Sequence, residues 1–119
     1  MLMNVATKTV LDLQGGQKAD LTPCIGYHAK FDNTEGVAGN QAWRVEFLGG
    51  PDGSGRQWCH LTNWATNTRL DMNQQNTANG TQVQGYTANA TPAQLWSFEP
   101  VRIGSGAFAY LYVLIHFFV

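Results

Sequence analysis

Short runs of apolar and β-branched residues recur along the chain, with clusters of Thr, Asn and Gly between them. Four such runs in the second half predict strands at residues 61–63, 69–72, 82–86 and 95–100. No ten-residue helical period lies among them, so the pattern predicts an all-β fold. Alternation within two runs places Leu11 and Leu70 on one face and Asp12 and Asp71 on the other. We therefore expect the leucines in the core and the aspartates at the surface.

The chain contains the same unit twice. Residues 2–27 align without a gap to residues 61–86, with 11 identities in 26 pairs, where average residue usage predicts about two. Each copy carries Asn-x-Ala-Thr-x-Thr-x-Leu-Asp and ends in Gln-x-Trp, and the first has six extra residues in its last loop, 29–39. At 119 residues the chain fits one domain. We predict a single domain at 1–119, with a first lobe at 1–50, a second at 56–101 and an incomplete or aberrant third at 102–119.

The composition of the chain narrows the range of ligand classes. The net charge is -1 and charged residues make up 13% of the chain, which gives no basic surface for nucleic acid or for anionic lipid. Polar content comes from Asn, Gln, Thr and Gly, beside four Trp and four Tyr whose flat faces suit stacking on sugars. Cys24 and Cys59 show neither a CxxC spacing nor a metal-ligand pattern, so we expect no disulfide framework, no metal and no cofactor.

Each copy combines a strand ending in Leu-Asp, a polar turn, an aromatic residue 15 positions after the Asp, and the closing Gln-x-Trp. Over residues 2–101 this combination resembles a lobe of the ricin B-type lectins, especially those of fungi. The resemblance implies a β-trefoil, a non-enzymatic lectin that binds glycans or glycoproteins, and shallow sites for galactose or N-acetylgalactosamine. It also implies that Trp43 and Trp96 are core residues and that Gln41 and Gln94 satisfy backbone groups beneath the sites.

In the first lobe the candidate sugar site consists of Asp12, Tyr27 and Asn40. Asp12 would accept hydrogen bonds from two hydroxyls, Tyr27 would stack on the sugar ring, and Asn40 would orient the ligand. His28 follows the tyrosine and would line the rim. The alternative for Asp12 is a structural role, capping the bend at residues 14–16. We favour this lobe as the binding lobe.

The second lobe offers Asp71, Gln84 and Tyr86. Gln84 stands where the family often places a hydrogen-bonding Gln. In contrast, Ala93 precedes the Gln-x-Trp where the first copy has an Asn, so the orienting Asn is absent. Asn89 in the neighbouring loop is a candidate substitute.

No catalytic residues are expected. His28, His60 and His116 occupy non-equivalent positions, and no Ser or Cys lies in a motif that would activate it. Glycosidase chemistry needs two carboxylates at one site, whereas Asp12 and Asp71 belong to different lobes.

The repeat pattern fails near the C-terminus. There is no charged residue after 102 and no third Gln-x-Trp, and the segment 107–119 is apolar but too short for a membrane span. Either the tail forms strands that cover the open side of a two-lobed structure, or the coding sequence runs into non-coding sequence. We favour the second, because the tail does not alternate as an exposed strand should. Two lobes alone would expose core surface, which makes a homodimer possible.

Three functional hypotheses follow. The first is a lectin for galactose-like sugars. The second is a protein-binding trefoil, such as a protease inhibitor that acts through the loop 29–39. The third is a module detached from a larger toxin or glycosidase, or a truncated lectin domain that binds nothing. The N-terminus lacks a secretory signal, so we expect a cytoplasmic protein, with secretion by another route left open.

Overall fold

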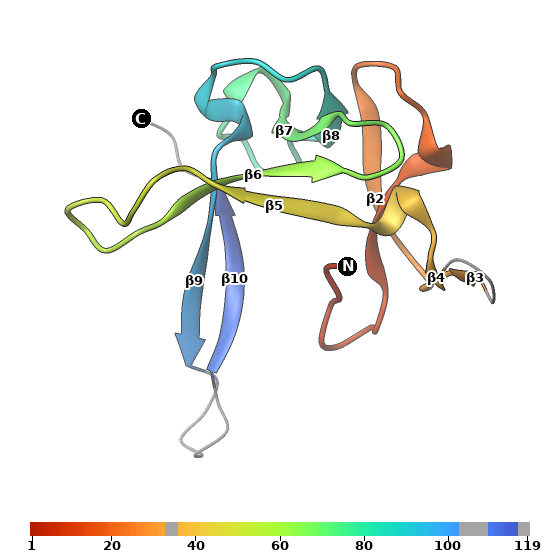
Figure 1. Ribbon diagram of the computed structural model, residues 1–119, viewed down its shortest axis with the longest axis horizontal. Helices are drawn as coiled ribbons and strands as arrows, with labels where there is room; N and C mark the ends of the chain where they lie inside the picture. The colour runs from red at the N-terminus through yellow and green to blue at the C-terminus, as the bar shows by residue number, and fades with distance from the viewer. Residues whose placement is uncertain (33–35, 103–109, 117–119) are drawn as a thin grey trace.

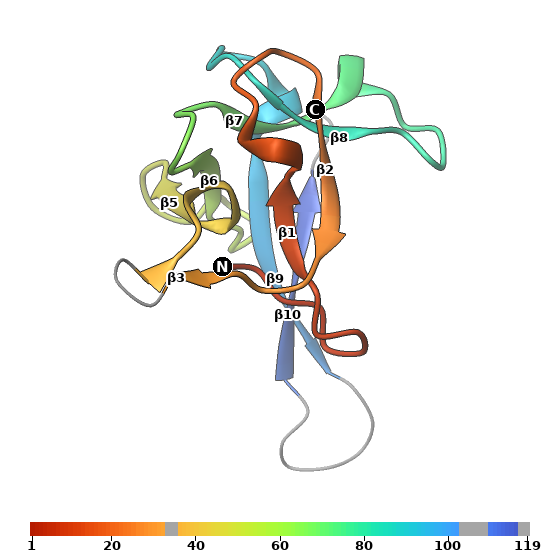
Figure 2. The same ribbon diagram turned by 90° about the vertical axis from the view of Figure 1, so that its right-hand side faces the viewer.

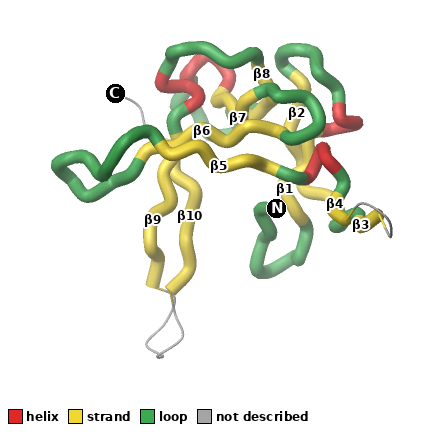
Figure 3. Tube along the Cα trace, in the orientation of Figure 1, coloured by secondary structure: helices red, strands yellow, loops and turns green. Residues whose placement is uncertain are grey.

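The computed structural model describes residues 1–32, 36–102 and 110–116. This part of the chain is all-β, as predicted, with strands joined by loops and single-turn 3-10 helices (Figures 1 and 3). The strands are β1 Val10–Leu13, β2 Thr22–Tyr27, β3 Phe31–Asp32, β4 Gly36–Val37, β5 Trp43–Phe47, β6 Trp58–Asn63, β7 Arg69–Met72, β8 Val83–Tyr86, β9 Trp96–Arg102 and β10 Tyr110–His116. The 3-10 turns are η1 Gln14–Gly16, η2 Gly39–Gln41, η3 Asn73–Gln75 and η4 Pro92–Gln94.

The two sequence repeats form two lobes with the same order of elements. β1, η1, β2, η2 and β5 of the first lobe correspond to β7, η3, β8, η4 and β9 of the second. The short β3–β4 hairpin belongs to the longer loop of the first lobe and projects from its side (Figure 1). The protease-inhibitor hypothesis uses the whole of that loop, 29–39, as the contact surface. Residues 33–35 of the loop lie outside the described residues.

One sheet of eight strands connects the lobes, in the order β1-β2-β8-β7-β6-β9-β10, with β5 also paired to β6. β2 meets β8 where Thr22 faces Gly85 and Pro23 faces Gln84. This pairing places β2 of the first lobe and β8 of the second side by side in one sheet.

The apolar tail contains a strand with a definite register. β10 pairs antiparallel with β9, with His116 opposite Trp96, and the two strands project side by side from the other strands of the sheet (Figures 1 and 2). In the preceding hairpin Asn63 of β6 lies opposite Trp43 of β5. The pairing of β10 with β9 therefore has the same register as the pairing of β6 with β5. β10 lies where the first strand of a further lobe would lie. The first explanation of the tail included such a strand, and both explanations stay predictions.

The core contains both Gln-x-Trp tryptophans, as predicted. It consists of Leu13, Trp43, Cys59, Leu61, Leu70 and Trp96. In the first lobe, however, Leu13 is fully buried and Leu11 only partly.

The prediction that the aspartates are exposed is wrong. Asp12 is 1% exposed and Asp71 is 3% exposed. Alternation identified the face on which they lie, but the turns η2 and η4 pack onto β1 and β7 and cover that face. Since a buried carboxylate needs hydrogen-bond partners, the covering turns must supply donors.

Candidate functional site

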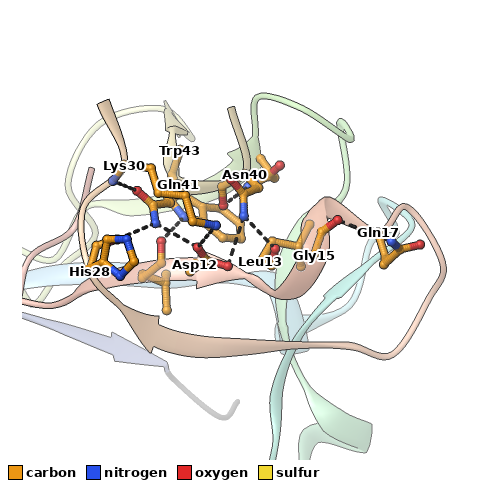
Figure 4. A network of polar contacts seen from close by, with 11 residues as sticks. Asp12, Leu13, Gly15, Gln17, His28, Lys30, Asn40, Gln41 and Trp43 are labelled. Atoms are coloured by element: carbon orange, nitrogen blue, oxygen red, sulfur yellow. Dashed lines mark hydrogen bonds and ion pairs between the residues drawn. The ribbon is translucent and has the colours of Figure 1, made fainter. Parts of the chain in front are cut away.

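In the first lobe, Asp12 accepts three hydrogen bonds (Figure 4). Its Oδ1 accepts from Nδ2 of Asn40 at 3.0 Å. Its Oδ2 accepts from Nε2 of Gln41 at 2.8 Å and from the ammonium of Lys30 at 3.4 Å. The turn η1 has no side-chain cap, so the role of Asp12 is to anchor this network rather than to cap the bend at residues 14–16.

Gln41 is fully buried and links three segments of the first lobe. Its Nε2 donates both to Asp12 and to the backbone carbonyl of His28, the latter at 2.9 Å, while its Oε1 accepts from the backbone N–H of Lys30 at 2.8 Å. Both amide hydrogens and the carbonyl are thereby used within the protein. This is the structural role expected for Gln41, and it leaves little of the side chain for a ligand.

Gln94 makes the same three bonds in the second lobe. Its Nε2 donates to Oδ2 of Asp71 and to the carbonyl of Thr87, each at 3.0 Å, and its Oε1 accepts from the N–H of Asn89 at 3.0 Å. The tryptophans also correspond, because each indole N–H donates to a backbone carbonyl one residue before the aspartate, Trp43 to Leu11 and Trp96 to Leu70. The two lobes therefore share one supporting framework.

Asp71 has a different set of partners from Asp12. Its Oδ1 accepts from Nε2 of Gln84 at 3.1 Å and its Oδ2 from Gln94. Gln84 is itself held through its Oε1, which accepts from Nε2 of Gln82 at 3.1 Å. No cation pairs with Asp71 among the described residues. Its donors are two neutral amides, so lone pairs on both oxygens remain available to a ligand.

A pocket of about 430 Å³ opens over Asp71. It contains all three residues predicted for the second site, together with Asn89, the candidate substitute for the orienting Asn. Its lining consists of Leu21, Asp71, Asn73, Gln74, Gln75, Gln84, Tyr86, Asn89, Thr91 and Ala93. Asn89 Oδ1 accepts from the N–H and hydroxyl of Thr91, at 3.1 and 2.6 Å. These bonds fix the orientation of the Asn89 amide.

The wall of this pocket includes an unusual turn. Gln74 and Gln75 both have left-handed backbone conformations, with φ of 52° and 55°. The equivalent first-lobe residues are Gly15 and Gly16, with φ of 62° and 61°. The turn has the same shape in both lobes, but only in the second does it carry side chains.

The predicted first-lobe residues also come together, but a cation lies among them. Tyr27 is 39% exposed, and its ring centroid is 4.4 Å from that of His28. The ammonium of Lys30 lies 4.4 Å from the Tyr27 ring centroid while it also contacts Asp12. Lys30 was not among the predicted site residues, although the offset of the repeat, continued by three residues, pairs it with Asn89.

The described residues give little support for metal binding, for a membrane-spanning helix or for a reactive cysteine. They contain no cluster of three or more His, Cys, Asp or Glu side chains suited to a metal ion. The helices found there include none that is long and apolar enough to span a membrane. Burial, assisted by the charge of Asp12, raises the pKa of the Cys24 thiol from 9.0 to about 12, and burial raises that of Cys59 to about 11. Neither thiol is an activated nucleophile, because the thiolate is disfavoured in both.

Comparison with known proteins identifies the family to which this chain belongs. The model of the ricin-type beta-trefoil lectin domain-like family matches residues 39–111, more than half of the chain. The chain belongs to this family. Membership confirms the predicted β-trefoil fold and indicates carbohydrate binding in general, in a family that is generally non-enzymatic.

A solved structure supports the same fold. The designed 3-fold symmetric protein ThreeFoil superposes with a TM-score of 0.65 and 23% identity, over 90% of this chain and 65% of that one. The lectin domain described here thus spans about 65% of the length of that protein. No curated protein matches the sequence.

Proposed function

We propose that this lectin domain binds terminal galactose or N-acetylgalactosamine-type sugars in the second-lobe pocket, with Asp71 and Tyr86 as the principal contacts. The observation that carries the proposal is the buried Asp71 carboxylate at a pocket that its own chain leaves open. The sequence favoured the first lobe, whereas the arrangement of donors favours the second.

Asp71 suits a pair of neighbouring sugar hydroxyls. Gln84 and Gln94 hold one oxygen each, so the carboxylate plane is fixed before the ligand arrives. Hydroxyl groups can donate to the remaining lone pairs, and hydrogen bonds to a charged acceptor are stronger than neutral ones. Because the protein donors are neutral, no ion pair has to be broken on binding.

Tyr86 and Asn89 supply the other two requirements. Both line the same pocket as Asp71. The Tyr86 ring offers a flat apolar surface for the C–H face of a pyranose. The Asn89 amide nitrogen has no hydrogen-bond partner among the described residues, so it can donate to a hydroxyl or to the acetamide carbonyl of N-acetylgalactosamine.

The pocket does not resemble that of a glycosidase. Asp71 is the one carboxylate in its described lining, and hydrolysis of a glycosidic bond uses two that flank it. We therefore propose that the ligand is bound and released unchanged.

The test compares matched variants of the two lobes. Asp71→Asn should weaken binding of galactose and N-acetylgalactosamine by at least about tenfold, because a charged acceptor is lost. Asp12→Asn is the matched control, since it removes the equivalent carboxylate from the other lobe, and it should leave the affinity unchanged. Isothermal titration with galactose, N-acetylgalactosamine and glucose gives the affinity and the selectivity. Retained affinity in Asp71→Asn would refute the proposal.

The cytoplasmic location and the possible homodimer stay predictions. Cell fractionation and analytical ultracentrifugation would test them.

A further inference from the structure

We infer that Lys30 closes the first-lobe site, so that the two lobes provide one open glycan site rather than two. The inference rests on the proposed function in one respect: the first-lobe site, once opened, should take the same class of sugar as the second. The residue that decides between closed and open is Lys30 in one lobe and Asn89 in the other.

The Lys30 ammonium occupies both positions that a sugar would need. It lies 3.4 Å from Oδ2 of Asp12 and 4.4 Å from the centroid of the Tyr27 ring. A pyranose stacked on Tyr27 would require the same space, since ring stacking brings carbon atoms to about 4 Å. Its hydroxyls would also require the Asp12 lone pairs that the ammonium uses.

Lys30 is held at this place by its backbone. Its N–H donates to Oε1 of Gln41 at 2.8 Å, and Gln41 in turn donates to Asp12. The same buried glutamine therefore fixes the aspartate and the start of the lysine side chain. The contact between ammonium and carboxylate is thus built on the shared framework, unlike a chance ion pair between two surface side chains.

In the second lobe the equivalent residue is attached to the buried glutamine in the same way, but its side chain does not close the site. Asn89 N–H donates to Oε1 of Gln94 at 3.0 Å, as Lys30 does to Gln41. Its side chain is short, neutral and turned to Thr91. No described cation lies over Tyr86. One side chain at one equivalent position thus separates a carboxylate with an ammonium partner from one that has none among the described residues.

Charge explains why a sugar would not simply displace the lysine. Asp12 is buried, whereas the Lys30 side chain is 40% exposed, so the pair lies at the boundary between protein and solvent. The ammonium is attracted by both the carboxylate and the electron-rich face of Tyr27. A neutral sugar would have to replace both interactions with hydroxyl hydrogen bonds and stacking, and the bound lysine competes as an intramolecular ligand.

The experiment uses the whole chain with the second-lobe site removed. In an Asp71→Asn background, Lys30→Asn should produce galactose binding at least about tenfold tighter than the background, a step that corresponds to ~1.4 kcal/mol. Lys18→Asn in the same background is the matched control, because it removes an equal charge from an exposed loop position, and it should produce no gain. Lys30→Ala is the second opening variant, and near-ultraviolet circular dichroism verifies that each variant is folded.

The outcomes separate this inference from the proposed function. If the unaltered protein binds galactose and neither folded opening variant gains binding in the Asp71→Asn background, Lys30 does not close the site and the inference fails alone. If the unaltered protein does not bind but the opening variants do, the proposed function of the second lobe fails and the inference stands. A gain in Lys18→Asn equal to that in Lys30→Asn would assign the effect to net charge and overturn the inference.

Discussion

The two lobes have one framework and two different sites. In each, a buried glutamine links the aspartate to the next loop, and a buried tryptophan is hydrogen-bonded to the strand that carries the aspartate. The lobes differ at five positions that line the second-lobe pocket, where Gln84, Asn89, Ala93, Gln74 and Gln75 correspond to Ile25, Lys30, Asn40, Gly15 and Gly16 of the first lobe. The residues that build a trefoil lobe are therefore separable from those that would equip it to bind a sugar.

The difference also shows why a matching aspartate is not sufficient evidence for a site. Asp12 and Asp71 are both buried and both bonded to a Gln-x-Trp glutamine. Within the described part of the chain, Asp12 has an ammonium partner as well and Asp71 has none. Both lobes have the carboxylate, and they differ in whether it is paired with a cation.

The largest effect is expected from removal of the buried glutamines. Gln94→Ala leaves Oδ2 of Asp71, the carbonyl of Thr87 and the N–H of Asn89 without their partner. Since each unsatisfied buried group costs about 1–3 kcal/mol, the free energy of unfolding should fall by roughly 3–5 kcal/mol. Urea denaturation measures this change.

The first-lobe counterpart should be milder. In Gln41→Ala, Oδ2 of Asp12 keeps its bond to Lys30, so we expect a loss about 1 kcal/mol smaller than for Gln94→Ala. Equal losses would mean that the ammonium does not compensate for the missing amide.

A second comparison concerns equivalent glycines. A Cβ on Gly85 would lie 2.7 Å from Cδ1 of Leu13 and 3.1 Å from Oγ1 of Thr68. Leu13 is fully buried, so Gly85→Ala should destabilise the fold by about 1–3 kcal/mol through overpacking. Thermal unfolding would test this value.

Gly26 provides the control in the first lobe. A Cβ there would lie 3.3 Å from Oγ1 of Thr9, and Gly26 is exposed. Gly26→Ala should therefore cost less than about 1 kcal/mol. A cost as large as that of Gly85→Ala would contradict the difference in packing between the lobes.

Exchange of the residues at one ligand-facing position should affect binding in one direction only. Gln84→Ile removes the donor to Oδ1 of Asp71 and should lower the affinity for galactose by up to about tenfold, because the carboxylate is less well oriented. The reciprocal Ile25→Gln should not create a site, since Lys30 still occupies Asp12. Titration of both variants measures this asymmetry, and a new site in Ile25→Gln would break it.

The smallest expected effect is on the free energy of unfolding at alkaline pH. The folded-state pKa of Cys24 is about 12 against an ordinary value of 9.0, so its stabilising contribution is complete below pH 9 and is lost as the pH rises toward 12. The repeat alignment places Val83 at the equivalent position. Cys24→Val should thus reduce the decline in unfolding free energy between pH 8 and about 10.5. An unchanged decline would assign it to other groups, such as Cys59.

The repeat made much of the fold predictable. The strand at residues 69–72 was predicted with the bounds of β7, because its alternation is flanked by turn-forming residues on both sides. The tryptophan core followed from the family resemblance. In contrast, alternation predicts on which face Asp12 and Asp71 lie but not whether a later turn covers that face. Their burial depends on η2 and η4, which are distant along the chain.

The site was predictable only in part. Asp71, Gln84 and Tyr86 were predicted as site residues, and they line one pocket. Lys30 was not, because its side chain acts through a loop that has six more residues than its counterpart. The strand β10 was also not predicted from residue similarity. Its correspondence to β6 lies in the pairing register, which becomes visible only when the backbone is placed.

The turn at Gln74 and Gln75 has a consequence for the history and the engineering of this domain. Left-handed backbone costs a non-glycine residue roughly 1–2 kcal/mol, and the first lobe shows that glycines form the same turn. The second lobe therefore has the less stable of the two turns at the rim of its pocket, and strained backbone of this kind is found most often at functional sites. Exchange of both glutamines for glycine should therefore make the fold more stable, and it would remove two side chains from the wall of the proposed sugar pocket.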